Sequence, residues 1–95
     1  MKIMEAIKNE NFTIYRIYLN DINIGSMEVI QEKDHIFLEN IFIDIAYRGK
    51  HLLKQCLDFF NQTIVCLPLP QHVEKFKHLG FKMYKQDELD TYYIR

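Results

Sequence analysis

The residues best suited to chemistry in this chain form a short basic turn, Tyr47-Arg48-Gly49-Lys50-His51. An apolar stretch with strand character, residues 41–45, runs into the turn, and an amphipathic helical pattern over residues 52–60 follows it. The first turn of a helix leaves backbone N–H groups unpaired and carries the positive end of the helix dipole. Arg48, Lys50 and His51 add side-chain charge at the same place. The turn is therefore a candidate anion site, and a phosphate-bearing ligand is the first expectation.

Length and composition limit the function classes. A chain of 95 residues is expected to form one domain, and 48% hydrophobic with 14% aromatic residues suffice for a packed core. The net charge of -1 offers no general attraction to nucleic acid or to an anionic membrane, so phosphate binding has to be local. The sequence has no apolar run of signal-peptide or membrane-span length, which makes a cytoplasmic location the expectation.

The cysteines and histidines do not form a metal-binding pattern. Cys56 and Cys66 fall in neither a CxxC nor another close spacing, and the favoured interpretation is two buried free thiols. The four histidines lack a spacing that would place two ligands on one helical face. We therefore expect no metal site.

The order of the predicted elements indicates a mixed sheet. Residues 1–10 form at most a short edge strand, and turn residues at 20–23 and 32–34 separate an antiparallel meander. The pattern predicts strands over residues 12–19, 24–31, 35–43, 63–67, 81–85 and 91–95, and helices over 52–60 and 70–79. The strand, helix and strand between 35 and 67 predict a right-handed crossover to a parallel neighbour.

Both faces of the strand over 35–43 are mostly apolar. Strict alternation puts Phe37, Ile41 and Ile43 on one face with Glu39, and Ile36, Leu38 and Phe42 on the other. The strand is therefore expected to be central and covered by helices on at least one side.

The strand and basic turn at 41–50 resemble those of the GNAT N-acetyltransferase superfamily. Leu79-Gly80-Phe81, after an amphipathic helix, resembles the same family's Leu-Gly-Phe signature, and Gly25 fits its early hairpin. The pieces occur in the family's order over residues 12–95. The resemblance implies a single α/β (α+β) domain over residues 1–95, with a mainly antiparallel sheet, two main helices, one parallel crossover and an abbreviated N-terminal helical region.

The resemblance also implies a cofactor site for acetyl-coenzyme A. The pantetheine arm would bond along one strand as an added strand does, at Ile41, Phe42 and Ile43. The pyrophosphate would lie on the N–H groups of the turn and the helix start, at Arg48, Gly49, Lys50, His51, Leu52 and Leu53. His51 and Leu53 stand where the family has small residues, and their side chains crowd this approach.

The implied chemistry is attack by a neutral amine on the thioester carbonyl, which needs a base and a proton donor. Glu39 is the candidate base, and a salt-bridged carboxylate at the strand edge is the alternative. Phe76 stands where many members carry a proton-donating tyrosine, which leaves Tyr84, Tyr92 or water as the donor. Leu69 stands where an asparagine is common.

Two functions remain open. The first is an acetyl-coenzyme A-dependent N-acetyltransferase acting on an amine of unknown identity, and the intact Tyr-Arg-Gly-Lys turn favours it. The second is a catalytically silent GNAT-like binding or inhibitory module, which His51, Leu53 and Phe76 favour. The abbreviated acceptor side would suit an extended substrate or one completed by a second subunit, so a homodimer or a protein partner stays open.

Overall fold

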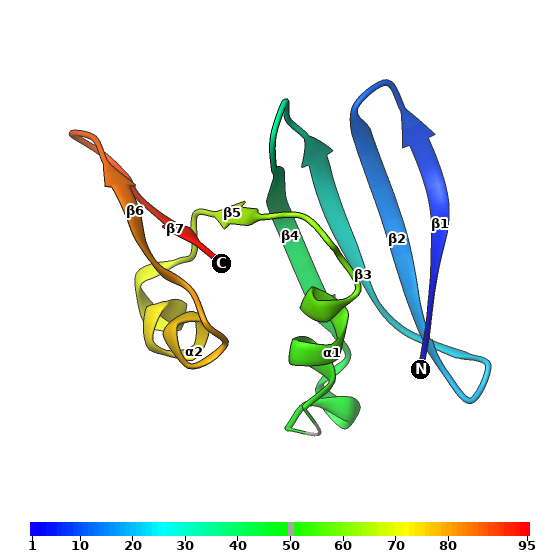
Figure 1. Ribbon diagram of the computed structural model, residues 1–95. Helices are drawn as coiled ribbons and strands as arrows, with labels where there is room; N and C mark the ends of the chain where they lie inside the picture. The colour runs from blue at the N-terminus through cyan, green and yellow to red at the C-terminus, as the bar shows by residue number, and fades with distance from the viewer. Residues whose placement is uncertain (50) are drawn as a thin grey trace.

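The computed structural model describes residues 1–49 and 51–95, so the predicted role of Lys50 falls outside the described residues. These residues form one seven-stranded sheet of order β1-β2-β3-β4-β5-β7-β6 with two short helices (Figure 1). The strands are β1 (Lys2–Asn9), β2 (Phe12–Leu19), β3 (Ile22–Gln31), β4 (Ile36–Ile43), β5 (Ile64–Cys66), β6 (Lys82–Gln86) and β7 (Thr91–Ile94). The helices are α1 (Leu52–Asp58) and α2 (Val73–His78), and 3-10 turns η1 (Ile45–Tyr47) and η2 (Pro70–His72) precede them.

Strands β1 to β4 form the expected antiparallel meander, with β1 as a full edge strand of eight residues. The tight turn between β2 and β3 consists of Asn20 and Asp21, whose φ angles of 51° and 65° are both positive. Asn and Asp tolerate this left-handed backbone better than other side chains, which is why a two-residue turn closes the hairpin here. The turn is tighter than predicted, because β3 already begins at Ile22.

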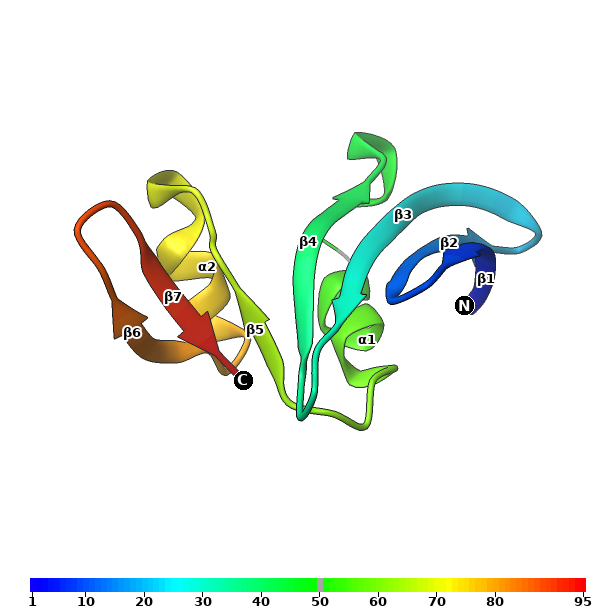
Figure 2. The same cartoon turned by 90° about the horizontal axis from the view of Figure 1, so that it is seen from above.

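Strands β4 and β5 are parallel neighbours, and α1 lies on the connection between them. The pairing runs from Ile36 with Ile64 to Leu38 with Cys66 and then stops. Beyond this point β4 and β5 diverge, as the view from above shows (Figure 2). The prediction of one parallel crossover in a mainly antiparallel sheet is confirmed.

A β-bulge in β4 corrects the predicted faces of this strand. Glu28 of β3 pairs with Asn40 and Val29 with Leu38, so Glu39 is an extra residue between them. An extra residue shifts the alternation by one position. Leu38 and Ile43 are consequently both buried in the core, and the prediction that they lie on opposite faces is wrong.

Both helices pack against the core of the sheet through apolar side chains. Leu57 of α1 and Phe76 of α2 share one core cluster with side chains of β3, β4, β5 and β7, and Leu52 and Cys56 of α1 join a second cluster beneath β2 and β3. The predicted helix over 52–60 is shorter, because the N–H groups of Phe59 and Phe60 bond three residues back and close α1 with a 3-10 turn.

Two further features of the fold bear on the site. Strand β3 approaches β4 so closely at Gly25 that an added Cβ would stand 2.1 Å from the backbone oxygen of Phe42. Both cysteines are buried free thiols, as predicted. Among the described residues, no helix is long and apolar enough to cross a membrane.

Candidate functional site: a cleft where the sheet splays

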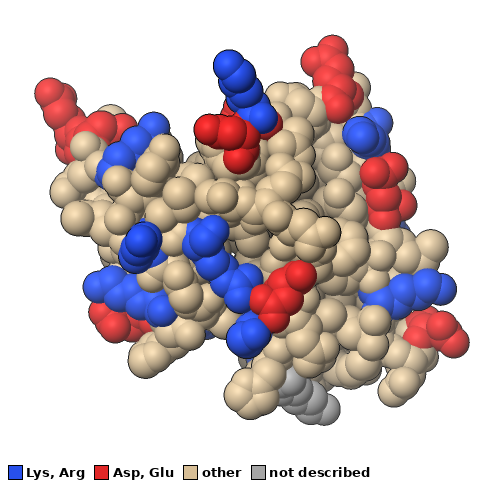
Figure 3. All heavy atoms as spheres, viewed as in Figure 1, with Lys and Arg blue, Asp and Glu red and all other residues tan. Residues whose placement is uncertain are grey.

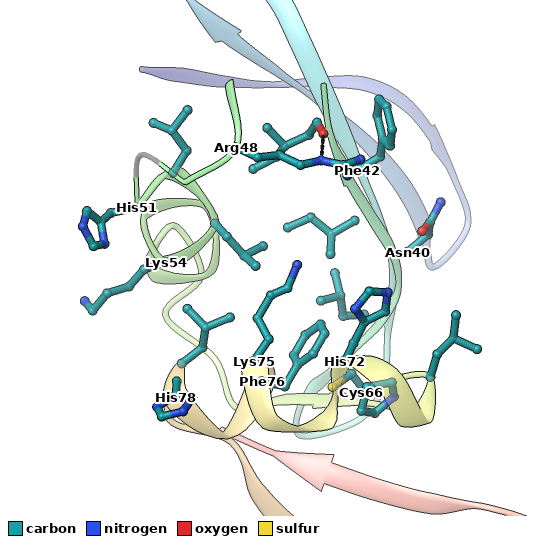
Figure 4. Close-up of a pocket in the computed structure, with 18 of the residues that line it drawn as sticks. Asn40, Phe42, Arg48, His51, Lys54, Cys66, His72, Lys75, Phe76 and His78 are labelled. Carbon is teal, nitrogen blue, oxygen red and sulfur yellow. Dashed lines mark hydrogen bonds between the residues drawn. The ribbon is translucent and has the colours of Figure 1, made fainter. Parts of the chain in front are cut away.

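A cleft of about 930 Å³ opens where β4 and β5 separate (Figure 4). Two walls face each other across it. We call residues 41–54, which form the end of β4, the basic turn and the start of α1, the α1 wall. We call residues 67–79, which run from the end of β5 through α2, the α2 wall. Leu38, Glu39 and Asn40 of β4 line the cleft beside the bulge, and Cys66 lines it from β5.

The edge of β4 that faces the cleft has backbone groups available for an added strand. The N–H of Asp44 donates to Ile24 of β3, so the C=O of Ile43, on the other side of the same trans peptide, points away from β3. By alternation, Ile41 and Ile43 direct their N–H and C=O groups to the cleft, whereas Phe42 directs its own to β3. The three residues predicted for the pantetheine arm therefore differ, since Phe42 offers no backbone group on this edge.

Arg48 is bonded to the protein's own backbone. Its Nε donates to the carbonyl oxygen of Ile43 at 2.7 Å, and its guanidinium carbon lies 5.6 Å from the centre of the Phe42 ring (Figure 4). This carbonyl is one of the groups on the open edge of β4. Arg48 thus closes part of the edge that the sequence predicts for a ligand, and it holds the turn against β4.

The turn itself has a left-handed backbone on both sides of residue 50. Gly49 has a φ of 80° and His51 a φ of 60°. A Cβ at Gly49 would meet no atom within 4 Å, so the space beside this glycine is open. The side chain of His51 makes no hydrogen bond that caps α1 and points away from the cleft, as does Lys54 (Figure 4). The crowding predicted from the size of His51 is therefore reduced by its orientation.

Two polar side chains of the α2 wall point into the cleft. They are His72 of η2 and Lys75 of α2, three residues apart, and the ring of Phe76 lies between them (Figure 4). Among the described lining residues, the formal cations are Arg48, Lys54 and Lys75, and the single carboxylate is Glu39. Figure 3 shows Lys and Arg side chains gathered over α2 and beside α1 on this face. The cleft is thus locally basic in a chain of net charge -1.

The predicted catalytic residues are not brought together. Glu39 is exposed at the bulge and lines the cleft. Tyr84 is 51% exposed on β6, and neither it nor Tyr92 is among the described residues that line the cleft. Phe76 is buried, with its ring centre 5.3 Å from that of Phe81. Leu69 lines the cleft and is 58% exposed, so an apolar side chain faces the ligand space there.

The cysteine in the cleft is not a nucleophile at neutral pH. Burial raises the pKa of the Cys66 thiol to about 12 and that of Cys56 to about 11, so both stay protonated. No group of three metal-ligating side chains lies close enough to hold an ion among residues 1–49 and 51–95.

Comparison with known proteins now adds to the geometry. No protein-family model and no curated protein matches the sequence. Solved structures do match, and several of them are described as acetyltransferases. One is an acetyltransferase from Thermus thermophilus, with a TM-score of 0.76 and 17% identity over 92% of this chain and 65% of that one. The chain has the GNAT fold.

Two Bacillus subtilis structures extend the comparison. The N-acetyltransferase YlbP in complex with coenzyme A has a TM-score of 0.74 and 18% identity over 87% of this chain and 68% of YlbP. A second acetyltransferase in complex with coenzyme A has a TM-score of 0.70 and 11% identity over 98% of this chain and 96% of that one. The chain therefore spans less than two thirds of the Thermus protein and nearly the whole length of the second Bacillus protein.

Within this GNAT fold, two inward-facing residues were missing from the sequence-based site. His72 and Lys75 lie three residues apart, and Lys75 directly precedes Phe76 in the apolar stripe of Val73, Phe76 and Leu79. A basic residue beside such a stripe, on a helix that borders a cleft, was the available signal.

Proposed function

We propose that this chain is an acyl-coenzyme A-dependent N-acyltransferase, with acetyl-coenzyme A as donor and an amine as acceptor. The observation that carries the proposal is the cleft at the splay of β4 and β5. It combines an open strand edge at Ile41 and Ile43 with a lining in which the described cations outnumber the one carboxylate. An amide-containing arm that ends in phosphates matches both properties.

The strand edge would hold the pantetheine arm. The N–H and C=O of Ile41 and the N–H of Ile43 are placed to bond its amides, while the C=O of Ile43 stays with Arg48. The described residues of the turn and of the helix start, 48–49 and 51–53, would lie at the phosphate end, where Gly49 leaves open space. The thioester would then lie toward the point where β4 and β5 part.

Glu39 is positioned to assist the acceptor amine. As the extra residue of the bulge it lies directly after the last β4 residue paired with β5, and its carboxylate is solvent-accessible. It would take a proton from the ammonium form of the acceptor, directly or through water, so that the nitrogen lone pair can attack the thioester carbonyl. The C–N bond then forms and the C–S bond breaks, the nitrogen loses a second proton to solvent as the amide forms, and the thiolate takes up a proton.

Water is the proton donor that this geometry favours for the thiolate. Phe76 occupies the inward position on α2 and has no proton to give. Tyr84, proposed from the sequence, lies on β6 and is half exposed. Holding two substrates in contact supplies much of the rate in such reactions, so a dedicated acid is not required for turnover.

A catalytically silent binding module is the second candidate. The buried Phe76 and the bonding of Arg48 to Ile43 favour it, because both remove groups that an acyltransferase could use. In this case acyl-coenzyme A would bind in the cleft as a ligand without turnover.

Calorimetric titration with acetyl-coenzyme A tests the proposal, followed by thiol-release assays with a panel of small amines and peptides. Micromolar binding with turnover would support the enzyme, and binding without turnover would support the silent module. No binding by the wild-type protein would overturn both. Glu39→Gln should lower kcat about a hundredfold if the carboxylate is the base, whereas Glu74→Gln, on the exposed side of α2, should leave kcat unchanged.

A further inference from the structure

We infer that Lys75 of α2 binds the diphosphate group of the acyl-coenzyme A, a role that the basic turn was expected to fill. The inference rests on the proposed function, since it names the residue that recognises the anionic part of the same ligand. It concerns a side chain on the opposite wall of the cleft from the predicted phosphate turn.

Three described Lys and Arg side chains line the cleft, and they differ in their partners. Lys54 donates to Asp58 at 2.8 Å and points away from the cleft (Figure 4). Arg48 bonds the carbonyl oxygen of Ile43 and lies over the Phe42 ring. Within residues 1–49 and 51–95, the ammonium group of Lys75 makes no hydrogen bond or ion pair. Among the described Lys and Arg side chains that line the cleft, it is thus the one that points into the cleft with no partner in the protein.

The Lys75 side chain is directed into the cleft (Figure 4). Its ammonium group points into the middle of the cleft, between the start of α1 and β4 (Figure 4). Lys77, two residues later on α2, is instead paired with Glu74 at 3.6 Å and does not line the cleft. Residues two apart on a helix face different directions, so the two lysines provide a matched pair that differs in access to the cleft.

The charge of the cleft lining indicates which kind of ligand group would bind beside Lys75. An ammonium group in a cleft with one carboxylate, Glu39 at the bulge, calls for an anion. The mid-cleft position of Lys75 faces the start of α1, where the phosphates of the proposed ligand would lie. A diphosphate with two negative charges and several acceptor oxygens matches a flexible ammonium donor. The charge would remain partly screened, because Lys75 is solvent-exposed in the free protein.

The experiment compares Lys75→Gln with Lys77→Gln by calorimetric titration with coenzyme A, 3′-dephospho-coenzyme A and pantetheine. Glutamine keeps most of the aliphatic stem and removes the charge. We expect Lys75→Gln to weaken binding of coenzyme A and of the dephospho form about tenfold, and to reduce the dependence of the affinity on salt. Pantetheine, which lacks the diphosphate, should bind both variants as it binds the wild type, and Lys77→Gln should change none of the affinities more than about twofold.

Several results would overturn the inference. Equal affinity of Lys75→Gln and wild type for coenzyme A would remove Lys75 from the ligand site and leave the proposed function standing. A loss for coenzyme A but not for the dephospho form would move the contact to the 3′-phosphate. An equal loss for pantetheine would show that the stem, not the charge, makes the contact. Failure of the wild type to bind coenzyme A would instead overturn the proposed function, and the inference with it.

Discussion

Two described cations of the α1 wall, Arg48 and Lys54, bond to groups of the protein itself, whereas Lys75 of the α2 wall points into the cleft. On the α1 side, Arg48 closes the end of β4, and Lys54 joins Asp58. The hydrogen bonds from Lys54 and from Arg95 hold the pKa of the Asp58 carboxyl below its usual value. On the α2 side, Lys75 and His72 point into the cleft (Figure 4).

From this difference we expect the two walls to contribute differently to stability and to ligand binding. Changes in the α1 wall should be detected first as losses of stability, and changes in the α2 wall first as losses of ligand affinity or turnover. The basic turn attracts attention in the sequence because its charges are concentrated there. In the fold, the Nε of its one described Lys or Arg, Arg48, already donates to a backbone carbonyl of the protein.

The largest effect is expected from Gly25→Val, which breaks the support of the α1 wall. The new Cβ would stand 2.1 Å from the backbone oxygen of Phe42, and a backbone atom cannot move aside as a side chain can. We expect β3 and β4 to be forced apart at a cost of about 3 kcal/mol, which lowers Tm by roughly 15 °C. Gly49→Ala is the control, because its Cβ would meet no atom within 4 Å. The positive φ of this residue alone should lower the stability, by about 1 kcal/mol. A Tm of Gly25→Val within about 2–3 °C of the wild-type Tm would contradict the close approach of β3 to β4.

The two buried thiols report at alkaline pH on the packing next to each wall, with Cys56 in α1 and Cys66 at the end of β5. Their native pKa values of about 11 and about 12 lie above the value of 9.0 for an exposed thiol. Between pH 9 and pH 11 the unfolded chain therefore loses protons that the native chain keeps, so stability falls as pH rises. The slope should reach about 1.4 kcal/mol per pH unit for each thiol.

Urea unfolding at several pH values measures this slope. Cys56→Ala and Cys66→Ala should each remove about half of the thiol contribution relative to wild type at the same pH. An unchanged slope in either variant would mean that water already reaches that thiol in the folded protein.

Phe76→Tyr sharpens the comparison by adding a proton donor to the α2 wall. The ring of Phe76 points toward the cleft, so the new hydroxyl could reach the departing thiolate (Figure 4). We expect kcat to rise about tenfold in the thiol-release assay with little change in KM. Tyr84→Phe, which removes a hydroxyl outside the cleft lining, should leave kcat unchanged. If Phe76→Tyr left kcat at the wild-type value, protonation by water would already be sufficient.

The smallest effect is expected from Arg48→Ala. Loss of the bond to Ile43 should lower the free energy of unfolding by about 1 kcal/mol, measured in urea, because one partly buried hydrogen bond is removed. The affinity for coenzyme A should change less than about threefold, since the guanidinium group is already held on β4. A tenfold loss of affinity at unchanged stability would restore Arg48 as a cofactor ligand and reverse the assignment of the two walls.

The sequence predicts the elements better than the side-chain roles. The strand predicted over 12–19 coincides with β2, because β-branched and aromatic residues run between turn residues at both ends. The parallel crossover followed from a helix between two apolar strands. The bulge at Glu39 was not predictable from alternation, because it depends on the register that β3 imposes on β4.

The orientations of the charged side chains could not be predicted, for a similar reason. Whether Arg48 binds a ligand or the protein depends on where the carbonyl of Ile43 points, and only the folded sheet fixes this direction. The inward position of Lys75 was not predicted, but the sequence held a local signal for it. Lys75 lies beside Phe76 on a helix whose apolar stripe was recognised. The difference is one of distance along the chain: local helix geometry can be derived from the sequence, and strand register cannot.

Strand β5 has a mechanical consequence for the whole molecule. With three residues, it carries all of the sheet pairing between the β1–β4 part and the β7–β6 hairpin. Any opening between these two parts of the sheet should therefore occur at β5. The hydrogen exchange of the β5 backbone amides should report such an opening. A ligand that pairs with the free edge of β4 on one side and contacts α2 on the other would span the same junction and brace it. Slower exchange of the β5 amides on binding would then measure how far the ligand completes the sheet.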